Sequence, residues 1–70
     1  MSVNDGLTVM EMLIVGSCID REGATEEQIL EDVAESTAAP AWEISRAIRG
    51  LYQRHELERR YDGAYEVPEW

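Results

Sequence analysis

The stretch PAWEISRAIRGLYQR, residues 40–54, decides the fold that this sequence predicts. Its apolar residues recur at helical spacing and define one core-facing side: Ala41, Ile44, Ala47, Ile48 and Leu51. Tyr52 is a further candidate for this side. Pro40 suits the first turn of a helix, where its missing N–H would have no partner. We therefore expect a helix over about 40–54. Its other side carries a tryptophan and polar residues: Trp42, Glu43, Ser45, Arg46, Arg49 and Gln53.

A first helix is expected well before this stretch, over about residues 8–20. Thr8 followed by Glu11 has the spacing of a capping box, in which each side chain bonds the other residue's backbone N–H. The residues that follow are apolar on nearly every side, which predicts a helix covered by neighbours on several faces. A buried strand is the alternative, but the length of the segment favours a helix.

A second helix is expected over about 26–36, between these two. Thr25 and Gln28 form another capping box at its start. One apolar stripe consists of Ile29, Leu30, Val33 and Ala34, and the remaining positions are mostly acidic. The link TAAP, residues 37–40, is short. Three helices with so short a link between the last two follow the helix-turn-helix plan.

After His55 the pattern changes from helical to alternating, which predicts two strands within about 56–67. Asp62-Gly63 is a strong hairpin signal, but the loop length is open. A two-residue loop would place Leu57 and Tyr65 on opposite faces of the hairpin. A three-residue loop with a left-handed Gly63 pairs Arg59 with Tyr65 and keeps the apolar residues together. We therefore expect the longer loop.

Two stretches of this sequence resemble parts of winged helix-turn-helix DNA-binding proteins, especially compact prokaryotic and archaeal regulators. ISRAIRGL, residues 44–51, resembles their third helix, and LERRYDGAY, residues 57–65, resembles their wing. The likeness covers about residues 7–67. It implies one α+β, mostly α domain over 1–70, with three helices and a C-terminal two-stranded β-hairpin wing. The third helix would read the major groove of double-stranded DNA and the wing would contact its backbone. The expected site is Trp42, Glu43, Ser45, Arg46, Arg49, Gln53, Arg59 and Arg60.

Two features depart from that family pattern. His55 follows the third helix where glycine is usual. Glu26 and Glu27 occupy the first turn of the second helix, where many relatives approach a phosphate. These carboxylates would repel DNA.

The charge balance favours two different interpretations. The chain has a net charge of −9, and its six basic residues are all arginine. Residues 1–40 hold nine acidic residues and one arginine, whereas residues 41–61 hold five arginines and three acidic residues. This composition resembles that of proteins from salt-loving archaea, where an acidic surface says little about partners. The alternative is an acidic interaction module, or an inhibitor that mimics nucleic acid, whose second helix binds a basic protein.

Several other functions lack support in the sequence. No segment approaches the ~20 apolar residues of a membrane span and residues 1–6 do not resemble a signal peptide, so we expect a cytoplasmic protein with no membrane partner. Cys18 and His55 are too few for a zinc site, and no catalytic constellation or cofactor motif is present, so we expect no enzyme and no cofactor. A homodimer on a palindromic site is the expected working form. It would have to use the first helix, the termini or Trp70.

Overall fold

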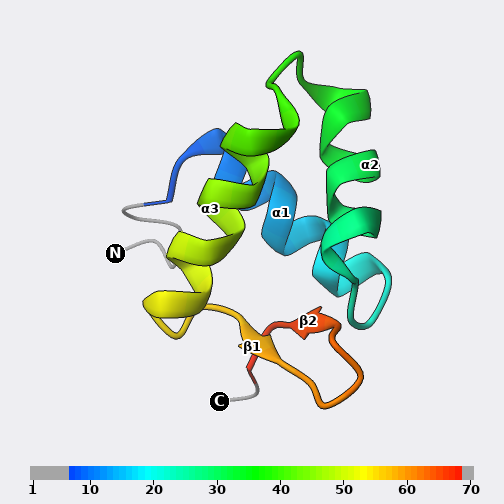
Figure 1. Ribbon diagram of the computed structural model, residues 1–70, viewed down its shortest axis with the longest axis vertical. Helices are drawn as coiled ribbons and strands as arrows, with labels where there is room; N and C mark the ends of the chain where they lie inside the picture. Colours follow the sequence, from blue (N-terminus) through cyan, green and yellow to red (C-terminus); the bar gives the residue numbers. More distant parts are fainter. Residues whose placement is uncertain (1–6, 69–70) are drawn as a thin grey trace.

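A computed structural model describes residues 7–68, and this part of the chain forms three helices followed by a short hairpin (Figure 1). Trp70 and the N-terminal six residues lie outside the described residues. The helices are α1 (Val9–Asp20), α2 (Glu26–Ser36) and α3 (Ala41–Gln53). The strands β1 (Glu58–Arg59) and β2 (Tyr65–Glu66) pair antiparallel. This winged-helix-like layout, α+β and mostly α, confirms the expected fold class.

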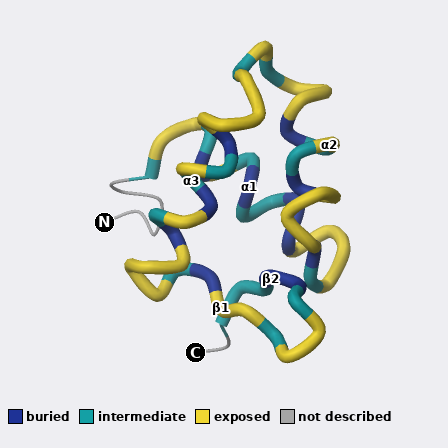
Figure 2. The backbone as a smooth tube through the Cα atoms, in the orientation of Figure 1, coloured by how far each residue is buried: buried dark blue, intermediate teal, exposed yellow. Residues whose placement is uncertain are grey.

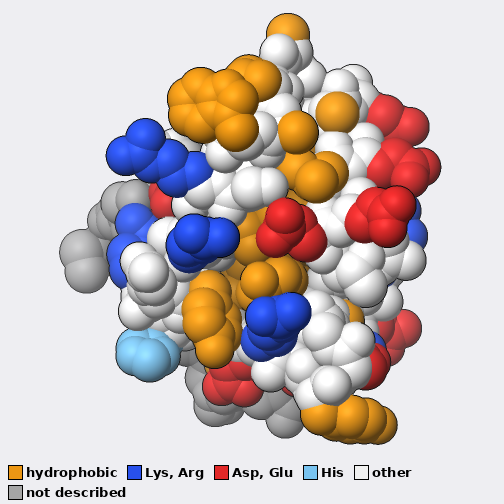
Figure 3. All heavy atoms as spheres, in the orientation of Figure 1, with side chains coloured by type: hydrophobic (Ala, Val, Ile, Leu, Met, Phe, Trp, Pro, Cys, Tyr) orange, Lys and Arg blue, Asp and Glu red, His pale blue; other side chains and the backbone are white. Residues whose placement is uncertain are grey.

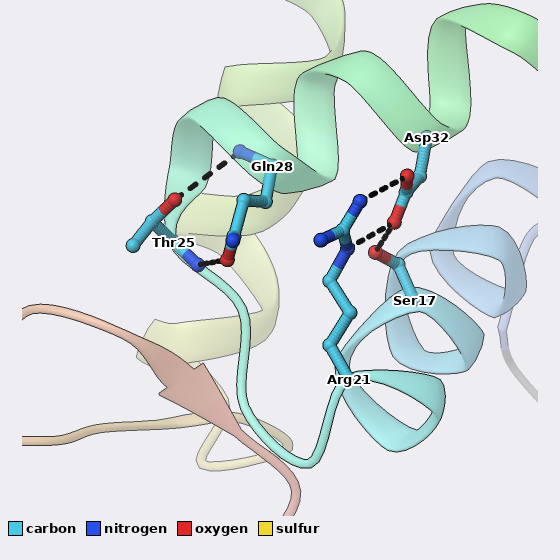
Figure 4. A network of polar contacts seen from close by, with 5 residues as sticks. All are labelled: Ser17, Arg21, Thr25, Gln28 and Asp32. Atoms are coloured by element: carbon cyan, nitrogen blue, oxygen red, sulfur yellow. Dashed lines mark hydrogen bonds and ion pairs between the residues drawn. The ribbon is translucent and has the colours of Figure 1, made fainter.

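The helices begin where the capping patterns predict. At Thr8 and Glu11, and again at Thr25 and Gln28, both reciprocal bonds of the capping box are present. Figure 4 shows the second box beside the α1–α2 contact. Helix α3 begins one residue later than expected because Pro40 is its N-cap and makes no side-chain capping bond.

The core lies where the three helices meet the wing (Figure 2). Its largest side chains are at most 1% exposed and come from every helix and from the residue before β1: Ile14, Ile29, Val33, Ile44, Ile48, Leu51 and Leu57. Because each helix contributes apolar side chains to one shared cluster, the positions of α3 and the wing depend on α1 as well as on each other.

The expected burial is wrong in two places. Helix α1 is apolar on nearly every side, yet Val9 and Ile19 are 71% and 58% exposed, because α2, α3 and the wing together cover only one side of it. Ala34 and Ala41 were expected in the core, and Tyr52 was a further candidate; all three are exposed. These three flank the apolar stripes of their helices, so the neighbouring helix does not reach them.

The hairpin has the register expected for the longer loop. Arg59 pairs with Tyr65, and Gly63 has a φ of +91°, in the left-handed region that glycine adopts without strain. The strands themselves are shorter than the predicted segments. A further pairing was not predicted: Ala24 exchanges both backbone hydrogen bonds with Tyr65, at 2.7 and 2.8 Å. The turn between α1 and α2 therefore adds a single-residue bridge to the side of β2 that β1 leaves free.

Helices α1 and α3 end in the same way. In each, the residue after the C-cap has a positive φ: Glu22 at 53° and His55 at 65°. The following N–H groups bond carbonyls of the last turn, Gly23 to Cys18 and Glu56 to Leu51, which is the Schellman arrangement. His55 thus keeps the left-handed conformation that explains the usual glycine at this position in the family it resembles.

Candidate nucleic-acid interface

One stripe of α3 faces directly away from the core. Trp42, Arg46, Arg49 and Gln53 follow one another at intervals of four, three and four residues, opposite Ile44, Ile48 and Leu51. All four are exposed, and Trp42 is 64% exposed. In Figure 3 basic side chains gather over α3, while most acidic side chains lie toward α2. The structure therefore places these four predicted site residues on a single open face.

The six arginines divide into two equal groups. Three pair with carboxylates: Arg21 with Asp32, Arg54 with Glu11 and Glu56, and Arg60 with Asp62, at 2.7–2.8 Å. The other three, Arg46, Arg49 and Arg59, make no ion pair with any residue among 7–68. Each of these three is exposed. Two of the unpaired arginines lie on the outer face of α3, and the third, Arg59, lies on strand β1 of the wing.

Arg59 is positioned by aromatic rings rather than by a carboxylate. Its guanidinium carbon lies 5.8 Å from the centroid of the Tyr65 ring. Tyr65 in turn meets Tyr52 of α3 edge to face, with ring centroids 6.0 Å apart. These contacts hold Arg59 beside the C-terminal end of α3 and leave its N–H groups available, because a ring face attracts the cation without accepting every donor.

Arg60, although adjacent, is already engaged. Its Nη2 donates to Asp62 Oδ2 at 2.8 Å and its Nη1 donates to the Glu22 backbone carbonyl at 3.2 Å. The hydrogen bond and charge of Asp62 raise the pKa of Arg60. The guanidinium packs over Gly23, where a Cβ would lie only 2.6 Å from Nη1. Arg60 therefore connects the wing to the α1–α2 turn. The expected contact between Arg60 and a DNA phosphate stays a prediction.

Carboxylates lie on both sides of the exposed stripe of α3. The half-buried Ser45 points toward α2, where its Oγ donates to Glu26 Oε2 at 3.0 Å. Glu43, on the other side of the stripe, is exposed. A carboxylate repels phosphate, but it also accepts a hydrogen bond from the cytosine amino group.

One carboxylate on the acidic side of α2, Asp32, takes part in an ion pair that connects two helices. Asp32 accepts hydrogen bonds from Arg21, at 2.7 and 2.8 Å, and from the Ser17 hydroxyl at 2.6 Å (Figure 4). The bonds from Arg21 and then Ser17 hold the pKa of Asp32 well below its usual range. Asp32 therefore binds α2 to α1. Glu27, Glu31 and Glu35 stay exposed on that helix.

A buried carboxylate connects α1 to α3. Glu11 is 8% exposed; its Oε1 accepts the Thr8 N–H at 2.9 Å and its Oε2 accepts Arg54 Nη2 at 2.7 Å. Burial alone would raise the pKa of Glu11, but the hydrogen bonds from Thr8 and the charge of Arg54 outweigh it, and the pKa is lowered. The capping pattern identified Glu11. Nothing in the sequence indicated its partner 43 residues away.

The residues considered for other chemistry lie apart from one another. Burial raises the pKa of the Cys18 thiol to about 11, so the thiol is protonated near neutral pH. His55 is exposed at the end of α3. Within residues 7–68 no three His, Cys, Asp or Glu side chains gather as metal ligands would, and none of the helices there is long and apolar enough to cross a membrane.

Comparisons with known proteins assign no family to this geometry. No protein-family model matches the chain, and no curated protein or solved structure matches it. The resemblance to winged helix-turn-helix proteins therefore rests on the residues quoted above and on the layout of the elements.

Proposed function

We propose that this protein binds double-stranded DNA, as a cytoplasmic transcription regulator, with α3 in the major groove and the wing on the backbone. The observation that carries the proposal is the division of the arginines. In a chain with 15 acidic residues, the three arginines without a carboxylate partner among residues 7–68 all lie on α3 and the wing. No carboxylate among residues 7–68 neutralises their charges in an ion pair, so an anionic ligand is their simplest partner.

The spacing of these arginines suits a duplex. Arg46 and Arg49 lie three residues apart on one helix face, and α3, with 13 residues, is about 20 Å long. A helix of this kind enters the major groove, where an arginine donates two hydrogen bonds to guanine O6 and N7. Arg59, held on the wing, is placed to meet a phosphate.

The acidic surface sets the expected strength and salt dependence of binding. A net charge of −9 repels DNA at long range, and screening by salt weakens that repulsion. Each phosphate contact contributes about −0.9 to the slope of log K against log salt. With only three unpaired arginines we expect a slope no steeper than about −3, much shallower than that of strongly basic DNA-binding proteins.

The test is binding to duplex DNA over a range of salt, measured by fluorescence anisotropy. Replacing both Arg46 and Arg49 with alanine should weaken binding by about 1–3 kcal/mol for each arginine that contacts a guanine. Arg59→Ala should weaken all sequences alike and reduce the slope by about one unit. Arg21→Ala removes a charge far from α3 and is the control for net charge. It should bind DNA as the parent does once folding is verified by circular dichroism.

The proposal fails if the folded Arg46→Ala/Arg49→Ala variant binds as tightly as the parent, or if the parent binds no duplex at any salt concentration. In the second case the exposed carboxylates Glu27, Glu31 and Glu35 become the leading site, with a basic protein as partner. That alternative predicts capture of a lysine-rich peptide by the parent. Converting the three glutamates to glutamine should abolish the capture.

A further inference from the structure

The outer face of α1 is apolar although it faces solvent. Val9, Met12, Gly16 and Ile19 recur at intervals of three, four and three residues, opposite the buried Ile14. Val9, Met12 and Ile19 are 71%, 38% and 58% exposed. Apolar residues at this spacing form the seam between two packed helices. We call these four residues the α1 seam.

The contacts within one chain do not account for the seam. Gly16 lies in the middle of a helix, where glycine is unfavourable. Apart from its chain neighbours and its own helix backbone, no atom of residues 7–68 comes within 4 Å of the position that its Cβ would occupy. The space beside it is an open hollow of about 460 Å³ between α1 and α2. Met12, Leu13 and Gly16 line one part of it, and the rest of the lining is polar or charged: Ser17, Asp20, Arg21, Asp32, Glu35 and Ser36. A glycine next to an unfilled hollow permits a second helix to approach closely.

The distribution of charge suggests which molecule approaches. Two like chains, each with a net charge of −9, repel most where acidic side chains gather, as they do on α2. Helix α1 contains only Glu11 and Asp20 as acidic residues. Glu11 is buried and paired with Arg54, which leaves Asp20 at the C-terminal end of the seam. Glu35 of α2 lines the hollow beside the seam together with Asp20, whereas Asp32 there is paired with Arg21. A second copy therefore reaches the seam more readily once salt screens Asp20 and Glu35.

We propose that the α1 seam binds a second copy of this chain, with the two α1 helices antiparallel about a two-fold axis. In this arrangement Val9 faces Ile19 of the second copy, and Met12 lies over its Gly16, at the apolar part of the hollow. Asp20 then lies beside the first turn of the other α1, where unpaired backbone N–H groups favour a negative charge. In a parallel arrangement Asp20 would face Asp20. The antiparallel pairing is thus the one that the charges favour.

The size of the seam sets the expected affinity. Helix α1 has 12 residues and is about 18 Å long, so two such helices bury less than the ~1,200 Å² of a stable specific interface. We expect a weak dimer that tightens as salt screens the acidic surfaces. The seam shares no residue with the exposed stripe of α3, so this inference does not rest on DNA binding.

The first test is sedimentation equilibrium over a wide range of protein concentration, in dilute and in molar potassium chloride. The parent should dimerise reversibly, and more strongly at high salt. Ile19→Glu should weaken the dimer at least tenfold, because it buries a charge in the seam. Tyr61→Glu makes the same charge change at a fully exposed residue of the wing, 104% exposed, and should dimerise like the parent. A parent that stays monomeric throughout, or an Ile19→Glu variant that dimerises normally, would overturn the proposal.

The second test determines the orientation by cross-linking. Variants Val9→Cys and Ile19→Cys are mixed in equal amounts and oxidised, and the cross-linked dimers are weighed by mass spectrometry. An antiparallel seam joins one variant to the other, whereas a parallel seam joins each variant to itself. The native Cys18 is 1% exposed, so the parent should give no cross-link and serves as the control. Cross-links within each variant alone, or none at all, contradict the antiparallel pairing.

Discussion

Helices α1 and α3 resemble each other on their inner faces and differ on their outer faces. Inside, both present isoleucines that are no more than 1% exposed: Ile14 from α1, and Ile44 and Ile48 from α3. Outside, α1 presents the apolar seam, whereas α3 presents Arg46 and Arg49 between Trp42 and Gln53. The inner faces explain why the chain folds. Because the outer faces lie outside the buried core, the two proposed binding surfaces rest on the chemistry of their exposed side chains.

The largest effect on the free energy of unfolding should appear when the same substitution is made on the inner and on the outer face of α1. Ile14→Ala removes a fully buried side chain of α1 and should cost about 2–5 kcal/mol of the free energy of unfolding. Ile19→Ala removes the same atoms from a side chain that is 58% exposed. It should change the free energy of unfolding by less than about 0.5 kcal/mol at low protein concentration. Urea denaturation followed by circular dichroism measures both.

A domain of this size is stabilised by only a few kcal/mol, so Ile14→Ala is expected to be largely unfolded without a stabilising salt. Ile48→Ala should behave similarly, because α3 contributes to the same core. Similar losses at positions 14 and 19 would mean that the outer face of α1 is covered in the free chain, and the division of α1 into inner and outer faces would be wrong.

The next effect concerns the ion pair that connects the two helices. Glu11→Gln keeps the capping geometry but loses the charge that Arg54 contacts, and should cost about 1–3 kcal/mol at neutral pH. Because the folded pKa of Glu11 is lowered, its stabilising contribution is complete above the unfolded pKa of about 4.3 and is lost as the pH falls through the folded value. The stability difference between parent and variant should therefore shrink in acid.

Glu56→Gln is the matched control for this ion pair. Glu56 also contacts Arg54, at 2.8 Å, but its side chain is 40% exposed, and exposed pairs contribute little. Its loss should change stability by less than about 0.5 kcal/mol at any pH. If Glu11→Gln and Glu56→Gln lost equal amounts of stability, burial of Glu11 would not decide the strength of its ion pair with Arg54.

The sequence predicted the features that depend on near neighbours. The capping residues set the starts of α1 and α2 to within one residue, and the alternation around Gly63 gave the correct hairpin register. Each of these follows from residues within a few positions of one another, so the pattern contains the whole cause. The inner face of α3 followed likewise from the spacing of its isoleucines.

The contacts between distant residues could not be predicted in the same way. Arg54 reaches Glu11, Arg60 reaches the carbonyl of Glu22, and Ala24 pairs with Tyr65. These partners meet only after the helices have packed. The outer face of α1 was misjudged for a related reason: a helix that is apolar all round does not reveal which side its neighbours will cover. The DNA site inferred from the arginines stays a prediction until binding is measured.

A smaller effect is expected where both helices end. Glu22 and His55 adopt positive φ angles, which cost L-residues free energy that glycine does not lose. Glu22→Gly and His55→Gly should each raise the free energy of unfolding by up to about 1 kcal/mol, and the two gains should add because the sites are independent. A loss of stability in either variant would mean that the side chain makes a contact worth more than the strain it imposes.

The last effect, also small, distinguishes the two outer faces most sharply. Gly16 of α1 and Gly50 of α3 both lie inside helices. Outside the backbone of its own helix and its chain neighbours, neither has an atom of the described part of the chain within 4 Å of its missing Cβ. Alanine at either position should therefore stabilise the isolated chain by about 0.5–1 kcal/mol through helix propensity. Gly50→Ala should keep this gain at every protein concentration. The gain of Gly16→Ala should shrink as concentration rises, because the new methyl group lies where Met12 of a second copy would pack. Thermal or urea unfolding at low and high protein concentration separates the two cases. Equal gains for both variants at all concentrations would show that no helix approaches α1 closely at Gly16.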